Sequence, residues 1–197
     1  MTARQFDVLA TVGIAVCWSA FALTWLGGAI YYQSRSPRER TRSWLGSTTA
    51  IGAVILLAVN LAVPRAGWQS LVFYATWARV LGLVVLLGGT VFTLWARLVL
   101  GAMWSAAPAV KEHHRLRTSG PYAITRHPIY TGILAMMLGT LLAAGGGRWA
   151  LPFPVFLALF EIKIHVEERL MMAEFPDDYP RYRRQVPQLV PGAILHR

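Results

Sequence analysis

The stretch GPYAITRHPIYTG, Gly120 to Gly132, sets a glycine-proline turn and several polar side chains directly before an apolar run. Arg126, His127 and Tyr130 supply its charged and hydrogen-bonding groups, and Pro128 is a residue suited to the first position of a helix. Taken alone, this pattern predicts no more than a capped helix start. Its meaning depends on what the rest of the chain places opposite it.

The composition around this stretch is that of a membrane protein. Of the 197 residues 55% are hydrophobic and only 14% are charged, which is too apolar for an ordinary soluble domain. A helix needs about 20 apolar residues to cross the roughly 30 Å hydrocarbon layer. We therefore predict an all-α, polytopic membrane protein with five transmembrane helices. The predicted spans are Val8 to Tyr32, Trp44 to Val63, Leu71 to Leu94, Ile129 to Ala144 and Trp149 to Phe160.

The positions of the basic residues predict the orientation of these spans. The net charge is +10, and only Arg4, Arg65 and Arg148 lie on the side opposite to the loops after the first, third and fifth spans. The positive-inside rule then places the N-terminus outside and the C-terminus in the cytosol, which requires an odd number of crossings. We expect a multi-pass protein of a bacterial inner membrane, with a basic face that attracts anionic lipid headgroups. No segment resembles a nucleic-acid-binding module.

The first apolar segment is expected to remain as a helix. It is too long for a cleavable signal peptide, carries Asp7 at its start and has no clear small-residue cleavage site. The single Cys17 lies inside it, so neither a disulfide framework nor a cysteine metal site is available. Arg79 lies near the outer end of the third span, where its charge can reach the membrane surface.

The chain divides into two parts. Residues 1–100 are three plain spans flanked by tryptophan and tyrosine, and residues 101–197 carry ionisable groups at both ends of the last two apolar segments. Gly145 to Arg148 predict a tight outer turn between those two segments, which therefore form a short helical hairpin. Its inner ends, near His127 and near Glu161 to Glu168, must lie close together at one membrane surface.

The tail after the hairpin is predicted to be helical and amphipathic. Pro176 ends the last hairpin helix, and a second short helix is expected to start at Asp177 and to end before Pro187. We expect these C-terminal amphipathic helices to lie against the inner face of the membrane.

Ionisable groups at membrane depth are costly and are usually functional, and His127, Lys163, Glu167 and Glu168 are the candidates. The alternative interpretation is structural. Lys163 and Glu167 are four residues apart and can form one ion pair at a helix end, while His127 caps the fourth helix. The convergence of all four groups on one end of the hairpin favours a functional site.

Other chemistries fit the sequence less well. The histidines and glutamates form no compact metal-ligand motif and no thiol accompanies them, so we expect no metal. Ser105 and Ser119 lie in no recognisable nucleophile turn, and the glycines form no nucleotide-binding fingerprint after a strand. The histidines weighed for a metal were His113, His114, His127 and His165.

Two segments together resemble the isoprenylcysteine carboxyl methyltransferase family and its bacterial relatives. They are HRLRTSGPYAITRHPIYTG, His114 to Gly132, and EERLMMAEFPDDYPRYRRQVPQLVPG, Glu167 to Gly192. Members of this family are integral membrane enzymes that use S-adenosylmethionine. The match covers roughly the C-terminal half in a fixed order and spacing, which makes it far more specific than a lone short motif.

The resemblance implies a cofactor pocket with two walls. Glu167, the first residue of the Glu-Glu pair, belongs to one wall, and Lys163, one helical turn before it, faces the substrate carboxylate. The other wall combines a His-x-Leu-x segment, the tyrosine of a Gly-x-Tyr turn and a His-Pro-x-Tyr element. Its residues are His114, Arg115, Leu116, Arg117, Tyr122, His127, Pro128, Ile129 and Tyr130.

The predicted enzyme is a carboxyl O-methyltransferase in which Lys163, Glu167 and Glu168 carry the catalysis. A carboxylate acceptor is already ionised and needs no general base, so Lys163 would orient it as a point charge. An amine or thiol acceptor would need a base, for which Glu168 and His127 are the candidates.

The acceptor is expected to enter sideways from the bilayer, in contact with membrane lipid. It can be a prenylcysteine-like acid, another small lipophilic acid or a phospholipid headgroup. Two other classes stay open, a sterol-reductase-like NADPH enzyme, which shares a similar His-Pro-x-Tyr-x-Gly element, and a non-enzymatic scaffold of the same fold.

Overall fold

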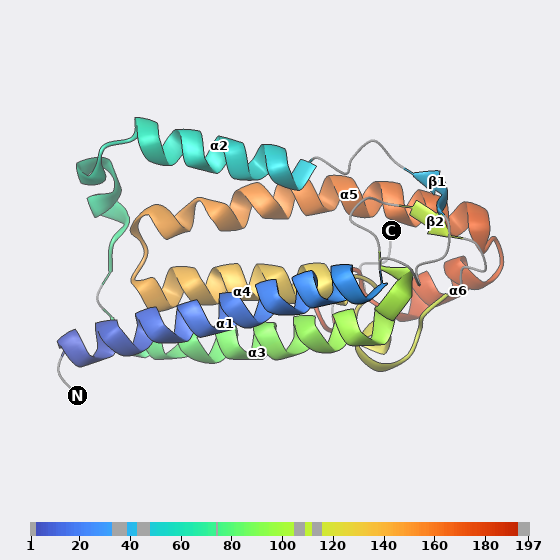
Figure 1. The fold of residues 1–197 in the computed structure, drawn as a ribbon, viewed down its shortest axis with the longest axis horizontal. Coiled ribbons are helices and arrows are strands. Elements are labelled where there is room, and N and C mark those ends of the chain that lie inside the picture. The colour runs from blue at the N-terminus through green and yellow to red at the C-terminus, as the bar shows by residue number, and fades with distance from the viewer. Residues whose placement is uncertain are drawn as a thin grey trace.

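The computed structural model describes residues 3–32, 39–42, 48–73, 75–104, 109–111 and 116–192 (Figure 1). Most of these residues are helical, as predicted, and the exception is a short antiparallel pairing of two strands that the sequence did not predict. The helices are α1 (Ala3–Tyr32), α2 (Thr48–Ala62), α3 (Thr76–Leu100), α4 (Pro128–Ala144), α5 (Pro152–Glu174) and α6 (Asp178–Gln185), and the strands are β1 (Glu39–Arg42) and β2 (Ala109–Lys111). Four short 3-10 helices connect them, Arg65–Leu71, Gly101–Met103, Gly120–Ala123 and Gly147–Ala150.

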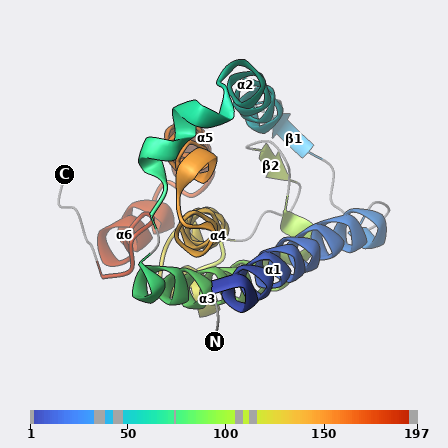
Figure 2. The ribbon, with the colours of Figure 1, turned by 90° about the vertical axis from the view of Figure 1, so that its left-hand side faces the viewer.

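The five long helices run along one axis, and α4 occupies the centre of the bundle. Seen end-on, α1 and α3 lie on one side of α4, and α2 and α5 lie on the other (Figure 2). The N-terminus lies at one end of the bundle, and α6 and the β1–β2 pair lie at the opposite end (Figure 1). We call the end that carries α6 the inner end and the opposite end the outer end.

Among the residues that the structure describes, three helical stretches are long and apolar enough to cross a membrane, Arg4–Tyr32, Thr76–Met103 and Gly147–Glu174. Gly52–Ala62 and Pro128–Ala144 are apolar but shorter, so the count of five crossings stays a prediction. Large apolar side chains cover the outside of the bundle, where Leu23, Leu61 and Leu98 are 68%, 79% and 70% exposed. Such a surface fits a protein surrounded by lipid.

The helix boundaries differ from the prediction at two points that matter for the site. The third span was expected to end at Leu94, but α3 continues to Leu100, so Arg97 lies inside the helix rather than in a loop. It also begins later than expected, at Thr76, because the chain before it forms the 3-10 helix Arg65–Leu71. The start predicted for the second span, at Trp44, falls outside the described residues.

Backbone contact joins α3 and α4 through glycines that lie two turns apart on each helix. They are Gly82 and Gly89 on α3 and Gly132 and Gly139 on α4. A Cβ atom built on Gly89 would lie 2.9 Å from the main-chain nitrogen of Met136, which is too close for any side chain. Small residues of this kind allow membrane helices to pack closely. We call this contact the α3–α4 seam.

The predicted hairpin of α4 and α5 is present, and glycine makes its outer turn. Gly145 adopts φ +80° and Gly146 φ +87°, values that residues with side chains rarely adopt. The Gly146 N–H donates to the carbonyl of Leu141 at 2.9 Å, and Phe73 N–H donates to the carbonyl of Gly145 at 2.9 Å. The turn is therefore held by main-chain bonds, and its geometry sets the inner ends of α4 and α5 side by side.

Arg79 is bound to protein groups at this outer end. Its Nη2 donates to Asp7 Oδ1 at 2.6 Å, and its Nε donates to the carbonyl oxygen of Ala143 at 3.1 Å. It therefore ties α3 to α1 and α4, which is more than the simple approach to the membrane surface that the sequence suggested.

Candidate active site

His127 lies at the inner end of the hairpin, between two glutamates of α5. Its Nδ1 lies 3.4 Å from Glu167 Oε2, and its Nε2 lies 3.4 Å from Glu168 Oε1. Burial by itself lowers the pKa of His127, but the hydrogen bonds and charges of Glu167 and Glu168 outweigh it and hold this pKa above its ordinary value of 6.5. The two carboxylates therefore favour the protonated form of the ring, and each of its nitrogens faces a carboxylate oxygen.

Glu168 is buried and is neutralised by arginines from two other segments. Arg126 Nε donates to Glu168 Oε1 at 2.8 Å, and Arg126 Nη2 lies 2.7 Å from the same oxygen. Arg183 of α6 approaches the other oxygen, with Nε 3.5 Å from Oε2. A buried carboxylate needs such partners, because an unpaired charge in this environment is strongly destabilising. Arg126 is the functional residue that sequence reasoning missed, although it directly precedes His127.

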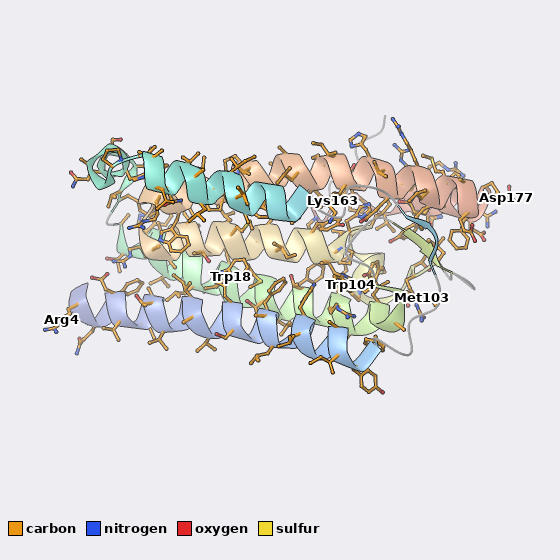
Figure 3. The ribbon with its side chains drawn as sticks, turned by 45° about the horizontal axis from the view of Figure 1, so that its top comes forward. Arg4, Trp18, Met103, Trp104, Lys163 and Asp177 are labelled. Carbon is orange, nitrogen blue, oxygen red and sulfur yellow. The ribbon has the colours of Figure 1, made fainter. Side chains whose placement is uncertain are left out.

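Tyr130 of α4 and Glu167 of α5 form a hydrogen-bonded pair across the hairpin. The Tyr130 hydroxyl donates to Glu167 Oε1 at 2.5 Å, and its ring stacks on Phe160 with centroids 4.6 Å apart. Lys163, only 4% exposed, lies with Nζ 5.9 Å from the centre of the Tyr130 ring. Figure 3 shows Lys163 on α5, above the helix that carries Tyr130. The Tyr130 side chain therefore lies between two predicted binding residues. Glu167, predicted to bind the cofactor, accepts from its hydroxyl, and Lys163, predicted to bind the substrate, lies over its ring face.

The segment Val186–Leu189, which we call the strap, closes the site on the side of α6. Its main-chain oxygens accept four hydrogen bonds from the stretch Gly120 to Gly132, one of which Arg126 Nη1 donates to Val186 at 2.5 Å. Arg126 N–H donates to Pro187 at 2.8 Å, His127 N–H donates to Gln188 at 3.2 Å, and Thr131 Oγ1 donates to Leu189 at 2.8 Å. Because α6 ends at Gln185 and Pro187 cannot continue a helix, the carbonyls of this segment are free to accept these bonds.

Tyr122 comes from the 3-10 helix Gly120–Ala123 and is buried beside α6. Tyr182 donates its hydroxyl to the main-chain oxygen of Tyr122 at 2.6 Å. Burial, followed by the negative charge of Glu167, raises the pKa of the Tyr122 phenol far above its usual range, so the hydroxyl remains protonated and can donate. Leu116 packs against the Tyr179, Tyr182 and Val186 cluster at the same end, and Arg117 is exposed.

The structure brings together most of the predicted site residues. Their contacts join His127 to Glu167 and Glu168, Tyr130 to Glu167, and Lys163 to the Tyr130 ring. Pro128 and Ile129 are buried in the first turn of α4. His114 and Arg115 lie outside the described residues, so their predicted role in cofactor binding stays a prediction. Within the described ranges, no group of three or more His, Cys, Asp or Glu side chains is placed to hold a metal ion.

The cluster of His127, Glu167 and Glu168 holds its charges in fixed positions, and each of its side chains already has a partner. The imidazole is occupied on both nitrogens, Glu168 is bound by two arginines, and both oxygens of Glu167 have partners. Such a cluster can bind a ligand that carries a positive and a negative charge, and it can orient a nucleophile that is already ionised.

Comparisons with known proteins agree with this geometry. The family model described as phospholipid methyltransferase matches residues 77–178. A protein-S-isoprenylcysteine O-methyltransferase of Schizosaccharomyces pombe is 37% identical over 81 residues, which is 41% of this chain and 34% of that protein. Protein-S-isoprenylcysteine O-methyltransferase B of Arabidopsis thaliana is 30% identical over 118 residues, covering 58% of this chain and 60% of that protein. The matches thus span about a third to three fifths of these relatives.

A solved structure of similar fold extends the likeness to nearly the whole chain. It is the eukaryotic intramembrane Ras methyltransferase ICMT, an isoprenylcysteine carboxyl methyltransferase, with a TM-score of 0.64 at 20% identity. The alignment covers 98% of this chain and 70% of that one. At this identity the likeness establishes the fold, including the helices of the N-terminal half.

Proposed function

The chain belongs to the phospholipid methyltransferase family, and from this premise we propose that it transfers a methyl group from S-adenosylmethionine to the carboxylate of a lipophilic acceptor. The observation that favours a carboxylate acceptor is the cluster of His127, Glu167 and Glu168, in which each ionisable group is already paired with another side chain. The resemblance to carboxyl methyltransferases points the same way.

The residues at the inner end have the chemistry that S-adenosylmethionine requires. This cofactor carries a sulfonium, an ammonium, a carboxylate and an adenine, and when bound it supplies an electrophilic methyl group. Glu167 is suited to its positive end, and the buried phenol of Tyr122 and the half-buried phenol of Tyr130 are suited to packing and hydrogen bonding. Leu116, Arg117, His127, Pro128 and Ile129 complete the proposed wall, together with His114 and Arg115.

The acceptor must arrive with a free electron pair, because the cluster has no free base to generate one. A lipid amine is protonated at neutral pH and would have to lose a proton before it attacked, whereas a carboxylate is ionised already. Lys163 would hold that carboxylate by its charge beside the Tyr130 ring. The structural argument therefore favours a lipophilic acid over an aminophospholipid, the substrate class that the family's description suggests.

In the proposed orientation the inner end faces the cytosol. S-adenosylmethionine would then reach the site from water, and the acceptor would reach it from the bilayer past the apolar helices. The N-terminus would lie outside, as the distribution of arginine predicts.

The decisive experiment uses purified protein in lipid nanodiscs with radiolabelled S-adenosylmethionine and a membrane lipid extract. A carboxyl methyl ester releases volatile methanol on mild alkali treatment, and we expect most of the transferred label to be released in this way. Label that stays in the lipid after alkali treatment would show that the acceptor is an amine or a thiol and not a carboxylate. No transfer and no heat of binding with the cofactor would contradict the proposed function altogether.

Binding to the cofactor is tested separately by calorimetry in detergent. We expect micromolar affinity for the wild type, about 8 kcal/mol, and loss of binding for Glu167→Gln and for His127→Ala. His165→Ala is the matched control, because this histidine also lies on the hairpin but is exposed. Unchanged binding in both site variants would refute the assignment of these residues.

A further inference from the structure

Arg97 is a further buried cation at the inner end, and the reaction proposed above does not use it. It lies in the last turn of α3 and is only 2% exposed. A charged side chain in an apolar helix is costly to bury and usually has a function. What surrounds its guanidinium therefore indicates what it does.

Aromatic rings from two parts of the chain surround this guanidinium. Its central carbon lies 4.8 Å from the ring centre of Trp104, 5.5 Å from that of Tyr32 and 5.9 Å from that of Trp25. Tyr32 and Trp25 belong to α1, and Trp104 follows α3 (Figure 3). Rings stabilise a cation through their faces but leave the N–H edge of a guanidinium in need of acceptors.

The hydrogen-bond acceptors around Arg97 do not satisfy all of its N–H groups. Arg97 Nη1 donates to the carbonyl oxygen of Gly101 at 3.0 Å, while Nε is buried and has no hydrogen-bond partner. In the part of the chain that the structure describes, no carboxylate is recorded in an ion pair with Arg97. A buried N–H without a partner is rare in folded proteins and points to a group that binds there.

The position of Arg97 relative to the candidate active site identifies that group. Arg97 lies one turn beyond Thr93 on the face of α3 that packs against α4, since a Cβ atom on Gly132 of α4 would lie 2.9 Å from the Thr93 Cβ atom. Tyr122 is near enough to interact electrostatically with both Glu167 and Arg97. Glu167 and Arg97 therefore lie near the same tyrosine, Tyr122. This pair of opposite charges is suited to a ligand that carries a positive and a negative charge at one end.

We propose that Arg97 binds the carboxylate of the amino-acid end of S-adenosylmethionine, with the aromatic rings of Trp104, Tyr32 and Trp25 holding the guanidinium in place. The proposal rests on the proposed function, because it takes S-adenosylmethionine as the ligand. A carboxylate supplies the paired acceptors that a guanidinium edge prefers and gives the orphaned Nε a partner.

The test compares S-adenosylmethionine with its decarboxylated analogue, which keeps the ammonium and sulfonium but lacks the carboxylate. Calorimetry of the full chain in detergent should show the wild type binding the parent cofactor about 10- to 100-fold more tightly, the range for a hydrogen-bonded charge. Arg97→Met should reduce this ratio to near one. Arg97→Lys, which keeps the charge but not the planar fork, should give an intermediate ratio.

Gly28 of α1 offers a second variant that keeps the arginine. A Cβ atom on Gly28 would lie 2.5 Å from Arg97 Nη2, so Gly28→Ala should displace the guanidinium without removing its charge and should lower the ratio severalfold. Gly27→Ala is the matched control, because a Cβ atom there meets nothing within 4 Å, and it should leave the ratio unchanged. This pair keeps the test valid if Arg97→Met does not fold.

Two results would overturn the inference while leaving the proposed function intact. One is an unchanged affinity for both ligands in Arg97→Met, which would follow if Arg97 bound the carboxylate of the acceptor. The other is an equal loss of affinity for both ligands, which would follow from a purely structural role. A wild type that binds neither ligand would overturn the proposed function and the inference together.

Discussion

The two ends of the α4–α5 hairpin are held together in opposite ways. At the outer end main-chain hydrogen bonds and glycines with positive φ close the turn, and the Arg79–Asp7 pair adds one partly exposed charge contact. At the inner end Arg126, His127, Glu167 and Glu168 form a buried network of opposite charges. A turn needs only geometry, so the glycines suffice. A network that must be desolvated as a unit is a poor way to gain stability, which indicates that its charges serve a ligand.

The largest difference between the two ends should appear on neutralising Glu168. Glu168→Gln leaves Arg126 and His127 without their shared acceptor in a buried position, so the free energy of unfolding should fall by about 3–5 kcal/mol. Thermal unfolding in detergent measures this. The control is Glu161→Gln, whose side chain is 40% exposed and should matter far less. If the two variants lost equal unfolding free energy, the buried charge network would contribute no more to stability than an exposed carboxylate does.

A smaller effect, with a different signature, is expected at the outer turn. Gly146→Ala places a Cβ atom against the carbonyl oxygen of Leu71 in a residue with φ +87°. The strain should cost about 1–3 kcal/mol of stability, while affinity for S-adenosylmethionine stays unchanged. Gly88→Ala, where a Cβ atom meets nothing within 4 Å, serves as the control. Loss of affinity in Gly146→Ala would mean that the outer turn also shapes the site.

The next effect depends on pH and is confined to the inner end. Because the folded-state pKa of His127 lies above 6.5, the stability that the charged ring contributes is fully present below that pH. It is lost as the pH rises through the higher folded-state value. The difference in melting temperature between the wild type and His127→Gln should therefore be largest at acid pH and shrink above pH 6.5. A difference that grows with pH would show that the ring is neutral.

The smallest effect should come from the charge pair of the outer end. Asp7 is 61% exposed, so Asp7→Asn should cost less than about 1 kcal/mol and less still at high salt. Melting curves at low and high ionic strength test this. A loss as large as that of Glu168→Gln would show that the outer end also depends on charge.

The sequence was sufficient to predict the hairpin and the meeting of its inner ends. Glycines mark the outer turn, and ionisable residues at the ends of apolar helices point to a common surface, so His127, Glu167 and Glu168 could be placed together in advance. The strap could not be predicted, because its bonds use main-chain oxygens that any residue offers. Its only sequence signal is a proline-rich extended segment.

Two buried arginines were not predicted as candidate site residues. A buried Glu168 requires a cation, and Arg126 directly precedes His127 in the opening stretch. Arg97 was assigned to a loop because the third span was expected to end at Leu94. Periodicity locates a helix end poorly, and the three extra residues that reach Arg97 place it inside the bundle.

The α3–α4 seam has a consequence for how this protein can change over evolutionary time. Gly82, Gly89, Gly132 and Gly139 each face backbone atoms, so a mutation to any larger residue at these positions forces the two helices apart. These four positions are therefore closed to gradual change. Under the proposed function, new acceptor preferences would be acquired on the α2–α5 side, where Gly52 meets the side chains of Leu159 and Phe156 rather than backbone.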